Sequence, residues 1–169
     1  MPQKKKGIGG LLWICIGICA GIILKLFVID FLRVSGNSME PVIHDGSVIL
    51  VHKAAFGIAS PLGSSLIRQW AEPEKDDIVI YLYNNKIVVK RCVATGGTKL
   101  AYDTDKGYSL LVEGKKIPLT EEQYHRMNTS GTVPEGYILA VGDNYGQSVD
   151  SRTYGFVPVK NILGKILCR

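Results

Sequence analysis

Residues 78–93 read IVIYLYNNKIVVKRCV, and this stretch decides the fold class. Two runs rich in β-branched residues, Ile78–Tyr81 and Ile87–Val93, flank the pair Asn84-Asn85. Asparagine tolerates the left-handed backbone conformation that a tight hairpin turn requires. The stretch therefore predicts two antiparallel strands joined by a short turn.

Similar short runs occur on both sides of this hairpin, and turn signals such as Asp45-Gly46 separate them. The sequence predicts strands at Val48–Val51, Ser109–Val112, Tyr137–Val141 and Ile162–Leu167. No long amphipathic helical period accompanies them. We therefore expect a mostly β protein, with an antiparallel β-sheet domain after one N-terminal transmembrane helix.

The N-terminal segment carries most of the excess hydrophobicity of the chain. Residues 8–24 contain no charged side chain, and the apolar run resumes after Lys25 as far as Ile29. As a helix, residues 8–29 would be roughly 30 Å long, which is the thickness of a bilayer core. A cleaved secretory signal is the alternative, but the run is longer than its apolar region usually is, and no A-x-A-like site follows.

These features predict the domain organisation. Residues 1–7 form a cytoplasmic tail, 8–29 a transmembrane anchor and 30–169 an extracytoplasmic β-rich domain, with a small polar insert at 98–136. Lys4, Lys5 and Lys6 precede the span, and a surplus of positive charge stays on the cytoplasmic side. We expect the insert to hold two short strands around Glu113-Gly114.

Charge and cysteine content exclude several classes of function. The net charge is +5, but Lys4, Lys5, Lys6 and Lys25 account for four of the positive charges, which leaves +1 for residues 26–169. This predicts no nucleic-acid partner. The four cysteines form no CxxC pair, and the three histidines lack zinc-ligand spacing, so we expect no metal and no cofactor.

Three segments after the span carry candidate chemistry. The first is Ser35-Gly36-Asn37-Ser38-Met39-Glu40-Pro41, which by itself is most simply a turn, because serine is a weak nucleophile without a base. The second contains Lys90 within an apolar strand, where burial would lower its pKa. Simple alternation would instead point Lys90 to solvent.

The third segment, residues 142–155, reads GDNYGQSVDSRTYG. Such a loop, rich in Gly, Asp, Asn and Ser, is common at the surface. Its charges also suggest two ion pairs that brace the strands around Lys90. They would join Asp150 and Arg152 with Arg91 and Asp143, and would leave Ser148 to position an amine.

In this order, behind an N-terminal apolar segment, the three segments resemble the type I signal peptidases of bacteria. The resemblance implies Ser38 as nucleophile in a Ser-Met-x-Pro motif and Lys90 as general base, with Arg91 beside it. It implies that Ser148 orients the lysine. It also assigns the scaffold to Asp143, Asp150 and Arg152. Residues 75–79 look like the Arg-Gly-Asp-Ile-Val strand of that family, with Asp76 where glycine is usual.

The chain departs from the family pattern at several positions. Val42 follows Pro41 where threonine is usual, and residues 94–97 replace a Gly-x-Pro-Gly turn. Tyr145 and Gly146 replace a charged pair. Gly36 occupies a position where some members carry a serine thought to help the oxyanion hole. The hole would therefore rest on backbone, chiefly the Ser38 N–H.

The resemblance implies a serine endopeptidase that removes signal peptides from exported preproteins beside the bilayer. A preference for small residues at −1 and −3 implies shallow apolar pockets, and we expect Met39, Ile78, Ile80 and Val88 to line them. Two rivals are a dedicated conjugative or pilus maturation peptidase and a catalytically idle, membrane-tethered peptide-binding β module. A triad built on His44 or His52 has no partner spacing to support it.

The segment Ala54–Trp70 is apolar, but Gly57, Pro61 and Gly63 exclude a regular helix. One hypothesis is that it rests on the bilayer surface, since tryptophan favours the membrane interface. The alternative is a loop folded over the β domain.

Overall fold

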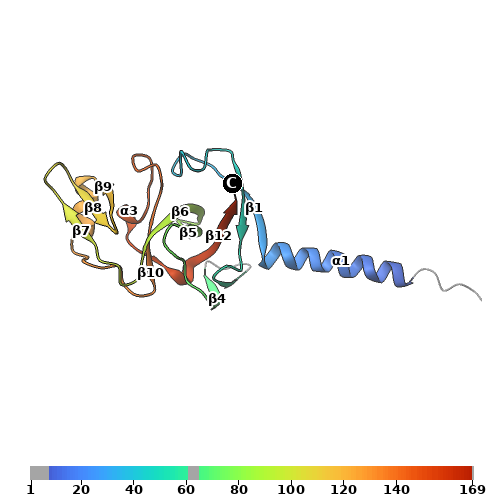
Figure 1. Cartoon of the computed structure of the whole chain (residues 1–169). Coiled ribbons are helices and arrows are strands. Elements are labelled where there is room, and N and C mark those ends of the chain that lie inside the picture. The colour runs from blue at the N-terminus through green and yellow to red at the C-terminus, as the bar shows by residue number, and fades with distance from the viewer. Residues whose placement is uncertain (1–7, 61–64, 169) are drawn as a thin grey trace, which may run out of the picture.

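The computed structural model describes residues 8–60 and 65–168. Helix α1 (Ile8–Phe27) extends away from the rest of the chain (Figure 1). Its residues 10–27 have a mean hydropathy of 2.3, and none of that window is buried. By length and composition the helix can cross a membrane. It ends at Phe27, two residues before the expected end of the anchor, because Ile29 already pairs with His52 in the first strand.

A seven-stranded antiparallel sheet forms the body of the domain, in the order β1-β2-β12-β5-β6-β10-β11. The mostly β, antiparallel prediction is confirmed. The strands are β1 (Ile29–Arg33), β2 (Val48–His52), β5 (Ile78–Tyr83), β6 (Lys86–Thr95), β10 (Tyr137–Val141), β11 (Val157–Pro158) and β12 (Ile162–Cys168).

The hairpin predicted for residues 78–93 is β5–β6. Its register runs from Tyr83 opposite Lys86 to Ile78 opposite Arg91. Asn84 and Asn85 both have positive φ, 49° and 59°, which is the backbone that a two-residue hairpin turn requires. Lys90 stands opposite Val79, so the hairpin carries it into the body of the sheet.

The polar insert is larger than expected. It forms a three-stranded sheet in place of two strands, followed by a short helix: β7 (Ala101–Asp103), β8 (Ser109–Val112), β9 (Lys115–Pro118) and α2 (Glu121–Met127). Thr120 caps α2, with its side chain accepting from the Gln123 N–H while the Gln123 side chain bonds the Thr120 N–H. β7 was missed because its three residues are too few to show alternation.

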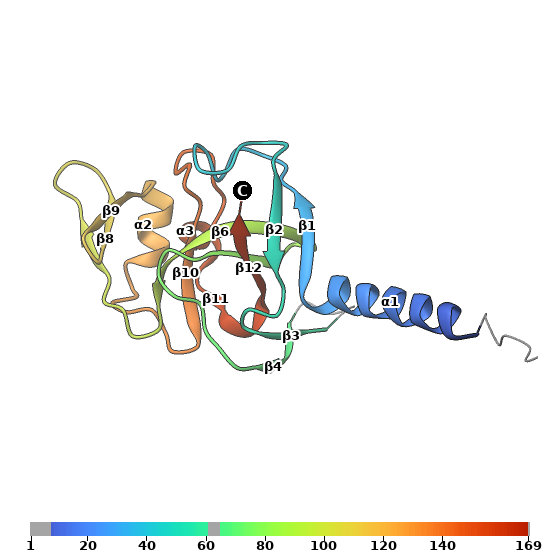
Figure 2. The ribbon, with the colours of Figure 1, turned by 45° about the vertical axis from the view of Figure 1, so that its right-hand side comes forward.

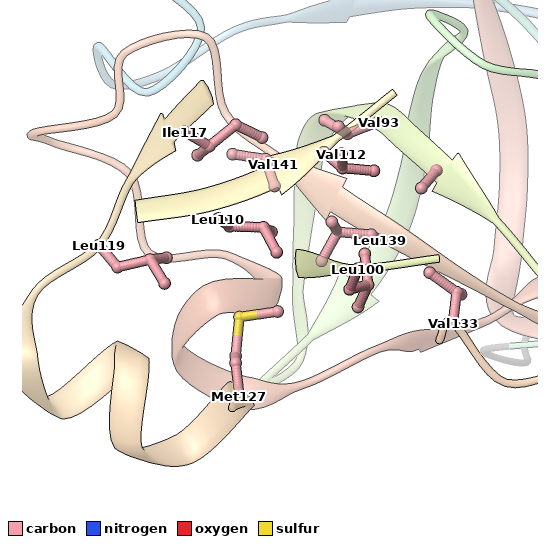
Figure 3. Packing of buried hydrophobic residues seen from close by; sticks show 11 residues of the cluster. Val93, Leu100, Leu110, Val112, Ile117, Leu119, Met127, Val133, Leu139 and Val141 are labelled. Carbon is pink, nitrogen blue, oxygen red and sulfur yellow. The ribbon is translucent and has the colours of Figure 1, made fainter. Parts of the chain in front are cut away.

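A buried apolar cluster joins the insert to the end of the main sheet (Figure 3). Leu110 and Ile117 from the insert and Leu139 from β10 are fully buried, and Met127 of α2 closes the cluster. The insert is therefore a packed part of the domain.

Four small elements complete the described part of the chain. Strands β3 (Gly57–Ala59) and β4 (Leu66–Gln69) form a separate hairpin within the segment Ala54–Trp70, of which residues 61–64 lie outside the described residues. Helix α3 (Ser151–Tyr154) and the 3-10 turn η1 (Val159–Asn161) follow β10 and β11. In two views, the loop between β1 and β2 and the loop after β10 lie side by side at the same edge of the domain (Figures 1 and 2).

Candidate active site

Ser38 lies in the loop between β1 and β2, where its hydroxyl meets a lysine from the distant hairpin. Lys90 Nζ donates to Ser38 Oγ over 2.7 Å. Met39, next to Ser38, is 1% exposed and fixes the loop to the core. On the other side, the Gly36 N–H donates to Asp45 Oδ1 at 2.8 Å. The nucleophile motif is therefore a braced loop and not a free surface turn.

Lys90 is 3% exposed, so the solvent-facing alternative is wrong. Burial lowers the pKa of the Lys90 amine, and the nearby Asp150 carboxylate opposes this shift only in part. Neighbouring side chains of a strand point to opposite faces, so Arg91 turns away from Ser38. The site thus pairs a hydroxyl with an amine whose neutral form burial favours.

Arg91 and Asp143 form one of the two ion pairs. Arg91 Nε and Nη2 donate to the two carboxylate oxygens of Asp143 at 2.8 Å and 2.7 Å, and Nη1 donates to the Asp76 carbonyl at 2.9 Å. This two-pronged geometry fixes Asp143, at the start of the loop after β10, against the strand that carries Lys90.

Asp150 and Arg152 form the second pair, and it is almost completely buried. Asp150 accepts from Arg152 Nε and Nη2, each at 2.9 Å, and from the Gly142 N–H at 3.0 Å. Arg152 also donates to the carbonyls of Pro118, Tyr145 and Ser148. Since every charged group has partners, the pair holds both ends of the loop in one geometry.

Ser148 and Gly142 lie where this loop meets Ser38. Ser148 Oγ is buried and has no hydrogen-bond partner within the described part of the chain, so no bond joins it to Lys90 here. A Cβ added to Gly142 would collide with Ser148 Oγ and with the Ser38 carbonyl oxygen. Only glycine therefore lets the two segments approach this closely.

Asn144 also holds the Ser38 loop and was not predicted from the sequence. Its backbone N–H donates to the Ser38 carbonyl at 3.0 Å, and its side-chain Nδ2 donates to the Asn37 carbonyl at 3.1 Å. The only signal in the sequence was its place in the 142–155 loop, which gave no hint of these partners.

Cys92 lies two residues after Lys90 and is fully buried. Burial raises the pKa of the Cys92 thiol to about 12, so the thiol stays protonated and is a poor nucleophile. The two histidines considered as alternative bases make no hydrogen bond to Ser38 among the described residues: His44 is exposed and lies 3.9 Å from Glu40, and His52 belongs to β2.

A hollow of about 240 Å³ opens beside Ser38 and Lys90, with β1 on one side and β6 on the other. Met39 and Val88 line it, as expected, together with Val34, Ile49 and Val89, which the sequence analysis did not name. Of the other expected lining residues, Ile80 lines a neighbouring hollow and Ile78 lines neither. β10 pairs with β6 only from Arg91 onward, so residues 86–90 leave one edge of β6 free along this hollow.

Comparison with known proteins assigns this chain to a family. A model of the family described as signal peptidase, peptidase S26, matches residues 8–169. The signal peptidase I of Bacillus caldolyticus is 30% identical, over 89% of this chain and 84% of that protein. The signal peptidase IB of Staphylococcus aureus (strain COL) is 25% identical, over 99% of this chain and 91% of its own.

Among solved structures, the crystal structure of a signal peptidase I from Enterococcus faecalis V583 is 26% identical, covers 57% of this chain and 98% of that one, and superposes with a TM-score of 0.42. The family match spans almost the whole chain, so the chain belongs to the signal peptidases of peptidase family S26, serine endopeptidases with signal peptidase I function.

Proposed function

We propose that Ser38 is the nucleophile and Lys90 the general base with which this chain removes signal peptides from exported preproteins. The observation that carries the proposal is the 2.7 Å contact between the Ser38 hydroxyl and the buried Lys90 amine. A serine needs an adjacent base to become nucleophilic, and a lysine serves as one when its pKa is low enough for the neutral form to be populated.

The reaction then proceeds by acyl transfer. Neutral Lys90 Nζ takes the proton of Ser38 Oγ as the oxygen bonds to the carbonyl carbon of residue −1. Lys90 passes that proton to the leaving amine of residue +1, and the C–N bond breaks. A water molecule loses a proton to Lys90, attacks the acyl-enzyme carbonyl, and Ser38 Oγ regains the proton.

The developing oxyanion requires a donor, and the Ser38 N–H supplies it. This N–H has no acceptor within the described part of the chain. In a planar trans peptide the N–H points opposite to the preceding C=O, here that of Asn37. The Asn144 side chain donates to this Asn37 carbonyl, and the Asn144 backbone N–H donates to the carbonyl of Ser38. Asn144 thus sets the direction of the Ser38 N–H.

Ser148 holds the Lys90 amine while it carries the proton. Its hydroxyl is buried, lies across Gly142 from the Ser38 carbonyl, and has a free bonding capacity that the protonated amine can use. Arg91, Asp143, Asp150 and Arg152 maintain the geometry of the strand and loop that carry these groups.

The substrate binds as an extended strand between the free edges of β1 and β6. Main-chain hydrogen bonds to such edges hold a peptide without regard to most of its sequence. The hollow of about 240 Å³ next to Ser38 accepts small apolar side chains at −1 and −3, with Met39 and Val88 among its walls.

We further propose that α1 is a retained membrane anchor, with the lysines at its N-terminal side in the cytoplasm and the β domain outside. The β3–β4 hairpin lies beside the junction of α1 and β1 (Figure 2). Phe56, just before β3, is buried in the core. Ile67 of β4 and Trp70, just after it, are 71% and 53% exposed. Exposed apolar side chains next to an anchor favour contact with the lipid bilayer.

Fluorescence of Trp70 tests the membrane contact in the full chain. Trp13→Phe leaves Trp70 as the sole tryptophan, and the protein is reconstituted into vesicles with brominated lipids. Quenching by the brominated lipids is expected. Emission that brominated lipids leave unchanged and that aqueous iodide quenches would overturn the contact.

The catalytic assignment is tested with a secretory preprotein and the detergent-solubilised chain, followed by amino-terminal sequencing of the product. Ser38→Ala, Lys90→Ala and Lys90→Arg should each abolish cleavage, because a guanidinium cannot act as a base near neutral pH. Activity should rise with pH as Lys90 loses its proton, through a range below the ordinary lysine pKa of 10.5. Substantial cleavage by the Lys90→Ala variant would disprove the pairing.

A further inference from the structure

A second hollow, of about 230 Å³, lies next to the cleft that contains Ser38. Leu32 and Ile87 line both hollows, so they form the boundary between the two. The remaining apolar walls of the second hollow come from four elements: Leu26 of α1, Ala59 of β3, Ile80 and Leu82 of β5, and Leu163 of β12. Nothing in the proposed mechanism uses this space.

The order of the lining residues gives the direction in which the hollows follow one another. On β6 the first hollow uses residues from Lys90 back to Ile87, and the second uses Ile87 alone. Along β1 and the residue after it, the first hollow uses Val34, Arg33 and Leu32, and the second uses Leu32 and Asp30. The second hollow therefore lies between the cleft and Leu26, near the end of α1. A peptide leaving the cleft toward the helix passes over it.

The lining favours an apolar occupant. Asp30 and Lys53 are the two charged residues of this hollow, and they lie 3.8 Å from each other, so each charge already has a partner. Among the described residues of the lining, Ser60 is the only other polar one. A charged substrate side chain would lose water here without gaining a free counter-ion.

An extended peptide supplies such an occupant at a defined position. Alternate side chains of a strand point to the same face and are about 6.6 Å apart. With −1 and −3 in the first hollow, the next side chain on that face is the one at −5. We propose that the second hollow is a subsite for an apolar side chain at position −5 of the signal peptide. This inference rests on the proposed function, because it uses the same cleft and the same extended substrate.

The test uses the full chain in detergent and peptide substrates that differ only at −5, with Gly, Ala, Leu or Lys. The Leu substrate should have a kcat/KM about tenfold above the Ala substrate, and the Lys substrate should be the poorest. Ala59→Trp should fill the hollow and remove the preference for Leu, while the Gly substrate is cleaved at the wild-type rate. Ala101→Trp, at an exposed position of β7 in the insert, is the matched control and should change nothing.

Leu82→Ala provides a second variant that does not depend on tolerance of a larger side chain. It should enlarge the hollow and shift the preference from Leu toward Phe at −5. If the wild type cleaves all four substrates equally well, or if both variants keep the wild-type order, the subsite is refuted while the proposed function stands. If the wild type cleaves none of the four, nor the preprotein, the proposed function itself fails.

Discussion

The loop of residues 142–155 and the insert of residues 98–136 both pack at the same end of the main sheet, yet their ion pairs are of opposite kinds. In the loop, the Arg152 and Asp150 side chains are 2% and 0% exposed. Around the insert, Lys115 pairs with Asp76, Lys116 with Asp103 and Lys75 with Glu113, all with partly exposed side chains. The two regions meet where Arg152 donates to the Pro118 carbonyl at the end of β9.

This difference separates two ways of holding a segment in place. A buried ion pair contributes little net stability, but removing one partner leaves a charge without water or counter-ion. Exposed pairs contribute little and are replaced by water at small cost. The loop beside Lys90 therefore depends on both partners of its buried ion pair, and removing either one destabilises it. The insert is held by its apolar cluster of Leu110, Ile117 and Met127.

The sharpest way to break the comparison is Asp150→Ala. It leaves Arg152 charged and buried and takes an acceptor from the Gly142 N–H. We expect a loss of about 3–5 kcal/mol in the free energy of unfolding, measured with urea in detergent, together with loss of cleavage. Asp103→Ala, which removes one exposed partner, is the matched control. Equal losses for the two variants would contradict the distinction.

Gly142→Ala tests the close approach of the loop to the nucleophile. The new methyl group collides with Ser148 Oγ and the Ser38 carbonyl. Cleavage should fall about a hundredfold because the reacting groups shift, with a destabilisation of about 1–3 kcal/mol. Gly146→Ala in the same loop, where an added Cβ meets nothing within 4 Å, should be close to wild type. A fully active Gly142→Ala would show that the loop can move away freely.

Asn144→Ala removes the side-chain hydrogen bond to the Asn37 carbonyl and keeps the backbone hydrogen bond to the Ser38 carbonyl. We expect kcat to fall about tenfold with KM unchanged, because the direction of the oxyanion donor matters most in the transition state. A peptide aldehyde that forms a tetrahedral adduct should lose affinity in parallel, and a product peptide should not. A change confined to KM would assign Asn144 to substrate binding.

Lys90→Met should act in the opposite direction on stability. The pKa of Lys90 is lowered in the folded chain, so the unfolded chain binds more protons between that lowered pKa and the ordinary value of 10.5. Stability therefore rises with pH through this window, and below it the fold carries the cost of a buried charge. The variant should unfold at a higher temperature at neutral pH, with this pH dependence gone. An unchanged slope would mean that Lys90 does not titrate differently in the two states.

Lys115→Met should have the smallest effect. It removes the ion pair with Asp76 but keeps an apolar stem of similar length, and both partners are partly exposed. The change in the free energy of unfolding should be under about 1 kcal/mol, with normal cleavage. A larger loss, insensitive to added salt, would show that the exposed pairs also hold the insert.

Elements that are set by interactions between neighbouring residues could be predicted from the sequence, and elements that depend on contacts with distant segments could not. The hairpin β5–β6 was predicted because its pattern and its Asn84-Asn85 turn are local. Strand β7 and helix α2 of the insert were missed. β7 has three residues, too few for a pattern, and α2 is held by a capping box and a single buried residue, Met127. Asp76 shows a local rule that could have been used: its φ is 70°, a conformation that favours the glycine usual at that position.

The sequence by itself determined the apolar helix at the start of the chain, the antiparallel β class, and which residues are candidates for the chemistry, because hydrophobic period, turn residues and motif spacing are properties of short segments. Only the tertiary structure decided that Lys90 turns inward to Ser38, that Asn144 holds the nucleophile loop, and that a second hollow opens toward α1. Each of these depends on segments that are far apart in the chain and are brought together by burial of their shared core. Strand alternation alone does not determine which face of the sheet a side chain such as Lys90 occupies.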